Sequence, residues 1–180
     1  MSLHEIVLPE TEPDTEWILG RAVQKVSPRR THARLQARFA VALWPWAEGR
    51  GELGSEWRFR VAPPREIRRP LAPDLAYVAN ERLAHLEGRE LELPAFAPDV
   101  AIEILSPGNV SKRIAHKVAV YLAAGSQLVI VVDPSDRSVR LHDPNGVRVL
   151  RDADAIEHAA LPGFRLALPT LFAVMDKPRL

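Results

Sequence analysis

Residues 98–134 constrain the fold more than any other part of this chain. An apolar run at 100–105 is followed by an amphipathic segment at 112–124, by Gly125, and by a second apolar run at 128–132. Short apolar runs are typical of strands buried on both faces, and a glycine after a periodic segment marks the end of a helix. A strand, a helix and a strand in this order form a βαβ unit with two parallel strands. The sequence therefore predicts an α/β fold.

Weaker patterns predict further elements on both sides of this unit. Residues 29–46 read as a helix whose N-terminus is capped at Ser27-Pro28. Its inward stripe has the helical spacing of three and four residues and consists of His32, Leu35, Phe39 and Leu43. We expect a hairpin at 18–26, strands at 56–61, 75–79, 139–142 and 147–150, a protruding loop or hairpin at 80–97, and a strand with a closing helix at 161–174.

The composition indicates an ordinary globular domain. The chain has 180 residues, 47% of them hydrophobic and 26% charged, so we expect a single domain over 1–180, with 1–15 as a peripheral or poorly ordered segment. The net charge of +1 gives no support for a protein that coats DNA. Neither a signal-like N-terminus nor a long apolar span is visible, so we expect a cytoplasmic protein with no membrane contact.

The absence of cysteine narrows the chemistry. Disulfides, thiolate catalysis and cysteine-based zinc sites are excluded, so any metal must be bound by oxygen or histidine ligands.

Acidic side chains are embedded in the predicted strands. Asp74 and Asp99 each follow a proline and begin an apolar strand, and Glu103 lies between Ile102 and Ile104. A buried carboxylate is costly unless it is paired, hydrogen-bonded or bound to a metal. Asp99 and Glu103 share one face of their strand. If the strand after Asp74 is its neighbour, Asp74 and Glu103 can converge on Mg²⁺ or Mn²⁺, with the Ile104 carbonyl as a third protein ligand.

The helix that follows Glu103 offers a lysine near this site. Taking Ile114, Val118, Tyr121 and Leu122 as the apolar stripe, the 100° step places Lys117 at its edge. Lys112 falls on the solvated side, and Arg113 lies further round. We therefore expect Lys117 to face the carboxylates, where an ammonium group would stabilise charge that develops on a phosphate.

These motifs together resemble a known family. Four parts of the sequence are similar to the Uma family of endonucleases. They are Asp74 in a Pro-Asp strand, the run Pro98 to Pro107 containing Glu103, the helix with Lys117 and Tyr121-Leu122-Ala123-Ala124-Gly125, and Val131-Val132-Asp133-Pro134. That family belongs to the restriction-endonuclease-like, PD-(D/E)XK superfamily. The similarity spans roughly residues 16–149.

The resemblance implies a mixed β-sheet flanked by helices, with Asp74 and Glu103 as metal ligands and a catalytic lysine. In the superfamily this lysine lies two residues after the second acid, a position that Leu105 occupies here. Similar proteins carry it on the following helix, where the helical periodicity independently places Lys117.

Structural roles remain open for the same residues. Asp74 and Asp99 could cap turns, Glu103 could pair with an arginine, and Lys117 could extend along a helix flank with its ammonium in water. Asp133 before Pro134 is typical of a turn. His32, Ser106 and Tyr121 could border the site or simply pack. Asp99 could border the site too, or could serve as an alternative metal ligand.

We hypothesise a nuclease that acts on DNA, with a homodimer as a candidate assembly, in which Asp74 and Glu103 bind Mg²⁺ or Mn²⁺ and Lys117 stabilises the transition state. The main alternative is a nuclease fold without catalysis that binds nucleic acid or a protein partner, which the leucine at position 105 favours. A third possibility is a metal enzyme acting on a small phosphorylated substrate.

Overall fold

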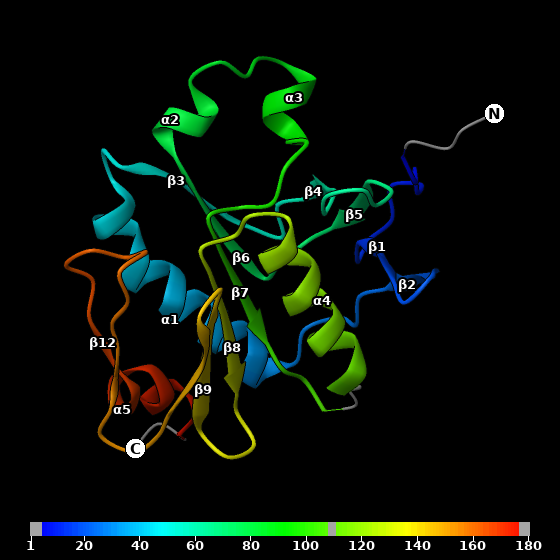
Figure 1. Ribbon diagram of the computed structural model, residues 1–180. Helices are drawn as coiled ribbons and strands as arrows, with labels where there is room; N and C mark the ends of the chain where they lie inside the picture. Colours follow the sequence, from blue (N-terminus) through cyan, green and yellow to red (C-terminus); the bar gives the residue numbers. More distant parts are fainter. Residues whose placement is uncertain (1–4, 108–110, 177–180) are drawn as a thin grey trace.

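A six-stranded mixed sheet forms the centre of the protein (Figure 1). The computed structural model describes residues 5–107 and 111–176. The strand order is β10-β9-β8-β7-β6-β3. The bounds are β3 Gly51–Ser55, β6 Leu75–Ala79, β7 Val100–Ile104, β8 Leu128–Asp133, β9 Ser138–Asp143 and β10 Gly146–Leu150. Strands β7 and β8 run parallel and the other neighbouring pairs are antiparallel, so the predicted βαβ unit and mixed sheet are confirmed.

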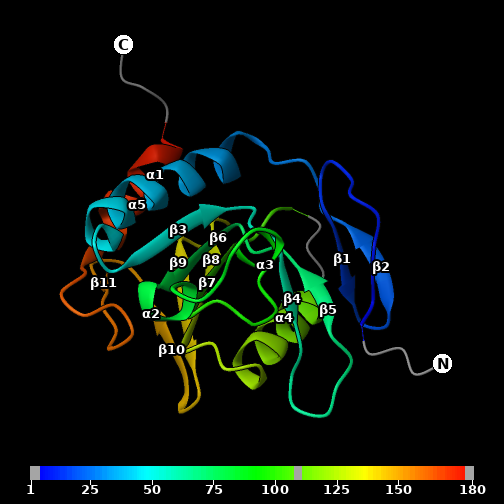
Figure 2. The same ribbon diagram turned by 90° about the horizontal axis from the view of Figure 1, so that it is seen from above.

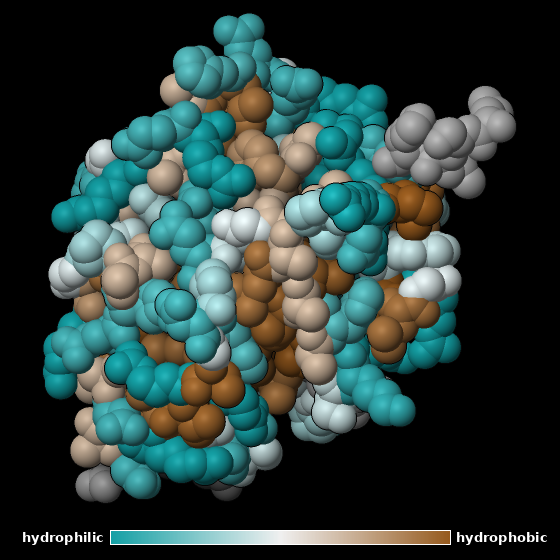
Figure 3. Space-filling view, in the orientation of Figure 1, coloured by the Kyte–Doolittle hydropathy of each residue, from teal (hydrophilic) through white to brown (hydrophobic). Residues whose placement is uncertain are grey.

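Helices cover both faces of this sheet. Figure 2 shows α1 (Arg30–Ala47) and α5 (Leu168–Phe172), which continues into the 3₁₀ turn η1 (Ala173–Met175), on one face and α4 (Ser111–Ala123) on the other. The predicted inward stripe of α1 is buried as expected. In Figure 3, apolar residues gather toward the middle of the face on which α4 lies, flanked by hydrophilic ones.

The alternation of side chains along β7 divides the core in two. Val100, Ile102 and Ile104 pack in the cluster that contains the buried stripe of α1, whereas Ala101 packs in the cluster of α4. Because successive side chains in a strand point to opposite faces, Glu103 must face α4. The register of β7 thus directs this carboxylate toward Lys117.

Three small hairpins and two short helices surround the main sheet. The hairpins pair β1 (Thr15–Ile18) with β2 (Arg21–Gln24), β4 (Phe59–Val61) with β5 (Arg69–Leu71), and β11 (Ala155–Ile156) with β12 (Leu166–Ala167). The expected N-terminal hairpin is therefore present, although it begins three residues earlier than predicted. None of the helices in the described part of the chain has the length and apolar character needed to cross a bilayer.

The N-terminal segment lies against the domain. The Ile6 amide donates to the Arg68 carbonyl at 2.8 Å, and Glu5 forms an ion pair with Arg60 at 3.3 Å. The part of the predicted peripheral segment from residue 5 to 14 is thus attached beside β4 and β5. Residues 1–4 lie outside the described residues.

Three local predictions were wrong. No side chain caps α1, whose N-cap residue is Arg29 rather than Ser27. The predicted strand at 56–61 is interrupted because Glu56 adopts a φ of +52°, which turns the chain between β3 and β4. Residues 80–97 contain two short helices, α2 (Asn80–Leu83) and α3 (Arg89–Glu92), instead of a plain loop or hairpin.

Candidate active site

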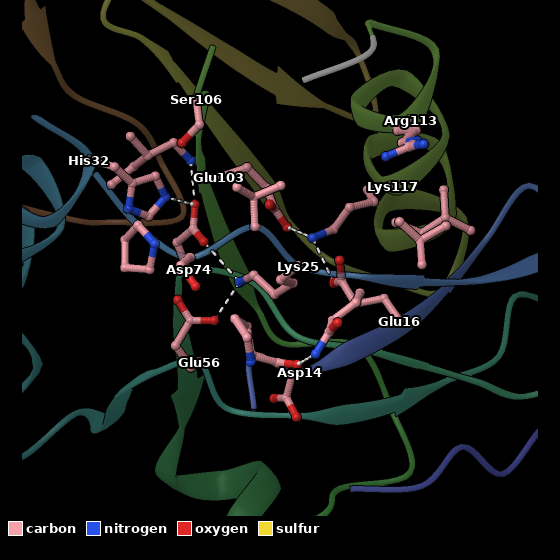
Figure 4. A pocket seen from close by; sticks show the side chains of 18 of the residues that line it. Asp14, Glu16, Lys25, His32, Glu56, Asp74, Glu103, Ser106, Arg113 and Lys117 are labelled. Carbon is pink, nitrogen blue, oxygen red and sulfur yellow. Dashed lines mark hydrogen bonds and ion pairs between the residues drawn. The ribbon is translucent and has the colours of Figure 1, made fainter. Parts of the chain in front are cut away.

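A cavity of about 640 Å³ opens where β6 begins and β7 ends. The hairpin β1–β2 and the segments before and after it form one wall. Residues from α1, β7 and α4 and from the turns that precede β4 and β6 also line the cavity. Figure 4 shows that Asp74, Glu103, Lys117, Lys25 and Glu16 gather there from elements far apart in the sequence. The carboxylates of Asp74 and Glu103 thus lie at one end of the sheet, in a hollow with room for a ligand.

Asp74 and Glu103 meet because β6 and β7 are antiparallel neighbours. Leu75 pairs with Ile102, so the residue before β6 lies beside the end of β7. Asp74 Oδ2 accepts a hydrogen bond from the Ile104 amide at 2.6 Å. The expectation that the strand after Asp74 is the neighbour of the strand carrying Glu103 is therefore confirmed.

Asp74 is buried among cationic and hydrogen-bonding partners. Its Oδ2 atom lies 3.1 Å from His32 Nε2, and its Oδ1 atom accepts a hydrogen bond from Lys25 Nζ at 2.9 Å. Burial alone would raise the pKa of Asp74, but the hydrogen bond with His32 and the charge of Lys25 hold this pKa well below its usual range. Asp74 therefore stays ionised throughout the physiological pH range.

Glu103 shares the ammonium group of Lys117 with a second buried carboxylate. Lys117 Nζ lies 2.6 Å from Glu103 Oε1 and 2.7 Å from Glu16 Oε1. The Tyr121 hydroxyl also donates to Glu103 Oε1, at 3.3 Å. The prediction that Lys117 faces the carboxylates is confirmed by these contacts, and Tyr121 borders the same group.

One lysine between two carboxylates shifts the protonation equilibria of the group. Burial raises the pKa of Glu103 to about 7, since the attraction of Lys117 is offset by repulsion from Asp74 and Glu16. Burial lowers the pKa of Lys117, but the charges of Glu103 and Glu16 outweigh it and raise this pKa above its ordinary value. Burial and the same carboxylates raise the pKa of Tyr121 well above 10. Lys117 therefore remains an ammonium group and Tyr121 a hydroxyl donor.

The expectation that Asp99 borders the site is corrected by its contacts. It accepts hydrogen bonds from the Ala79 amide at 2.8 Å, Arg82 at 2.9 Å and Gln127 at 3.3 Å. Asp99 and these partners lie at the opposite end of β6 and β7. Asp99 is four residues before Glu103, which corresponds to about 13 Å along the strand at roughly 3.3 Å per residue. Asp99 ties β6, α2 and the start of β8 together there.

The remaining candidates take different positions. Ser106 lines the cavity, as does Arg113 at the start of α4, whereas Lys112 is exposed as predicted. Asp133 accepts hydrogen bonds from the amide and hydroxyl groups of Ser135, so it is the turn residue that Asp133-Pro134 indicated.

Sequence reasoning missed Glu16, Lys25 and Glu56. Glu16 lies on the buried face of β1 together with Ile18, and it accepts a hydrogen bond from the Ala72 amide at 2.8 Å. An acid two residues before an inward isoleucine was a signal that could have been used. Lys25 follows β2 with no pattern around it, and Glu56 occupies the turn after β3, so only the tertiary structure brings these two residues to Asp74.

The donor set suits a hard divalent cation, although the side chains are not arranged as a closed coordination shell. Within residues 5–107 and 111–176, no group of three or more His, Asp or Glu side chains is positioned to hold a metal. Lys25 and Lys117 lie between the carboxylates instead. The carboxylates of Asp74 and Glu103 are nevertheless hard oxygen donors of the kind that Mg²⁺ or Mn²⁺ prefers.

A mixed sheet with acidic side chains at the adjoining ends of two central strands, and a lysine beside them, defines a nuclease-like class of α/β protein. The chain belongs to the Uma2 family, whose model carries the description "Putative restriction endonuclease" and matches residues 3–169. The resemblance seen in the sequence is thereby confirmed.

A solved structure supports the same assignment of the fold. The crystal structure of "a putative nuclease belonging to DUF820" from Anabaena variabilis ATCC 29413 is similar with a TM-score of 0.80 and 25% sequence identity. The alignment covers 94% of this chain and 95% of that one. The predicted restriction-endonuclease-like fold is thus confirmed. No curated protein matches the chain.

Proposed function

We propose that this protein is a divalent-metal-dependent endonuclease that cleaves phosphodiester bonds in DNA. The observation that carries the proposal is an excess of carboxylates over ammonium groups among the residues that line the cavity. Four carboxylates, those of Glu16, Glu56, Asp74 and Glu103, are joined there by the ammonium groups of Lys25 and Lys117. When all four are ionised, the group lacks two positive charges, the charge of one divalent cation.

Asp74 and Glu103 are the residues proposed to hold Mg²⁺ or Mn²⁺, with the Ile104 carbonyl as a further ligand. Both carboxylates are buried. Glu103 projects from β7 and Asp74 immediately precedes β6, so the pairing of these two strands fixes their positions. The hydrogen bond from the Ile104 amide orients Asp74 further. A divalent cation bound there would lower the pKa of a water molecule and so supply a nucleophile at neutral pH.

Lys117 is proposed to stabilise the negative charge that develops on the phosphate. Its ammonium group is buried and held by Glu103 and Glu16, so it is preorganised beside the proposed metal ligands. A raised pKa keeps its proton on Nζ, which favours an electrostatic role over that of a general base. Tyr121 and His32 are proposed to orient Glu103 and Asp74, respectively, through the hydrogen bonds described above.

The position of Lys117 also bears on the alternative of a non-catalytic module. The leucine at position 105 was the feature that favoured this alternative, because a lysine is expected there in the superfamily. Lys117 supplies an ammonium group 2.6 Å from Glu103 from another element. A positive charge next to the second acid is therefore retained, and this supports catalysis.

Mn²⁺ binding and plasmid nicking test the proposal together. We expect the parent protein to bind Mn²⁺ in calorimetry and to nick supercoiled DNA, and Asp74→Asn and Glu103→Gln to lose both properties. Asp99→Asn is the matched control, since this Pro-Asp carboxylate lies at the other end of the strands. A parent protein that neither binds Mn²⁺ nor nicks DNA, or site variants that behave like the parent, would refute the proposal.

A further inference from the structure

The Lys25 ammonium group contacts Asp74, one of the candidate metal ligands, together with two further oxygen acceptors. Its ammonium group donates to Asp74 Oδ1 at 2.9 Å and to the Ala72 carbonyl at 3.0 Å, and it forms an ion pair with Glu56. Only 13% of the Lys25 side chain is exposed. A monovalent cation carried by the chain itself is thus bound to Asp74.

The other oxygen of Asp74 is already saturated. Oδ2 accepts the Ile104 amide at 2.6 Å and lies 3.1 Å from His32 Nε2. A carboxylate oxygen offers two lone-pair sites, so both sites on Oδ2 are used. A metal ion that binds Asp74 must therefore approach Oδ1, the atom that Lys25 contacts.

Lys25 and a divalent ion cannot occupy the space next to Oδ1 together. Two cations a few ångströms apart repel strongly beside Asp74, because its side chain is only 4% exposed and solvent screens charges poorly there. The ammonium group must move away when a metal ion arrives. Its departure is feasible only if another carboxylate can accept it, since an unpaired buried charge is costly.

Glu56 provides that second partner at the mouth of the cavity. Its side chain is 43% exposed, compared with 4% for Asp74. Gln36 holds Glu56 in place by donating to Oε1 at 3.1 Å, and the same amide group donates to the Asp74 carbonyl at 2.7 Å. Lys25 can thus leave Asp74 and keep an ion pair with Glu56 in a better-hydrated position.

We propose that Lys25 is a resident cation that competes with the divalent metal for Asp74, and that Glu56 accepts its ammonium group when the metal binds. This inference rests on the metal site of the proposed function. It gives opposite roles to two residues of one ion pair. Lys25 weakens metal binding, and Glu56 strengthens it without being a ligand.

Calorimetric titration with Mn²⁺ tests these opposite roles in the 180-residue chain. We expect Lys25→Met to bind Mn²⁺ about tenfold more tightly than the parent, within the range typical of coupled sites. We expect Glu56→Gln to bind it more weakly, because Lys25 then has only Asp74 as a partner. In the double variant the effect of Glu56→Gln should vanish, so its affinity should equal that of Lys25→Met. Lys112→Met, an exposed lysine on α4, should match the parent.

Thermal unfolding with and without Mn²⁺ provides a second measurement. Lys25→Met should unfold at a lower temperature than the parent without metal, since Asp74 loses its counter-charge, and should show the larger rise when Mn²⁺ is added. Lys25→Gln replaces Lys25→Met if the latter does not fold.

Two results would overturn the inference while leaving the proposed function intact. One is an unchanged or lower Mn²⁺ affinity in both Lys25 variants. The other is a loss of affinity on Glu56→Gln in the Lys25→Met background as well, which would make Glu56 a metal ligand. If neither the parent nor the Lys25 variants bind Mn²⁺, the proposed metal site itself fails, and the inference with it.

Discussion

Replacing Glu103 by glutamine should change how the stability of the protein depends on pH. Burial, together with repulsion from Asp74 and Glu16, raises the pKa of Glu103 from 4.5 to about 7, which corresponds to about 3 kcal/mol. The folded protein then binds this proton more tightly than the unfolded chain does. Its contribution to stability is fully present below pH 4.5 and is lost as the pH rises to about 7. Glutamine has the same shape and no proton to lose.

Urea denaturation in the presence of a chelator, at intervals between pH 4.5 and 8, measures this contribution. We expect the free energy of unfolding of the parent, minus that of Glu103→Gln, to fall by about 3 kcal/mol across this range. Burial lowers the pKa values of His116 and His142, which affects the same pH window, but both proteins share this contribution and it cancels in the difference. Glu52→Gln, on the exposed side of β3, serves as a control. A difference that stays flat with pH would show that Glu103 titrates as an ordinary carboxyl group.

Three further predictions concern other parts of the structure. Lys117→Met should lower the free energy of unfolding at pH 8 by about 3–5 kcal/mol, because Glu16 and Glu103 lose their shared buried counter-charge. Urea denaturation measures this change, and a decrease below about 1 kcal/mol would contradict the role given to this lysine. Asp99→Ala should lower the free energy of unfolding by about 2–3 kcal/mol, because the hydrogen bonds of Asp99 are lost. The affinity for Mn²⁺ in calorimetry should stay unchanged, and an altered affinity would place Asp99 in the site after all. Gly51→Ala should lower the free energy of unfolding by about 2 kcal/mol or more, since the alanine Cβ atom would lie 2.2 Å from the Val78 carbonyl oxygen. An unchanged melting temperature would show that β3 can move away from β6.

Much of the fold followed from short-range patterns. The apolar runs and the glycine at the end of α4 predicted the βαβ unit. Burial of a strand on both faces and the end of a helix each require particular residue types within a few positions of sequence. Strand β3 was missed since its sequence, Gly51 to Ser55, contains two glycines and little β propensity. It becomes a strand because Gly51 lets the backbone approach Val78 closely, a contact made 27 residues further along the chain.

For the candidate site, local sequence patterns identified the side chains whose burial needed an explanation. A glutamate inside an apolar strand and a lysine on the edge of a helix stripe can be recognised from a few neighbouring residues. The periodicities of the strand and the helix predict the faces on which Glu103 and Lys117 lie. The contacts between residues far apart in the sequence depend on the tertiary structure. The antiparallel register of β6 and β7 brings Asp74 to Glu103 and carries Asp99 to the opposite end, although both aspartates follow a proline. The packing of the N-terminal hairpin adds Glu16 and Lys25, because charge pairing in a buried cavity selects partners by distance and not by separation along the chain.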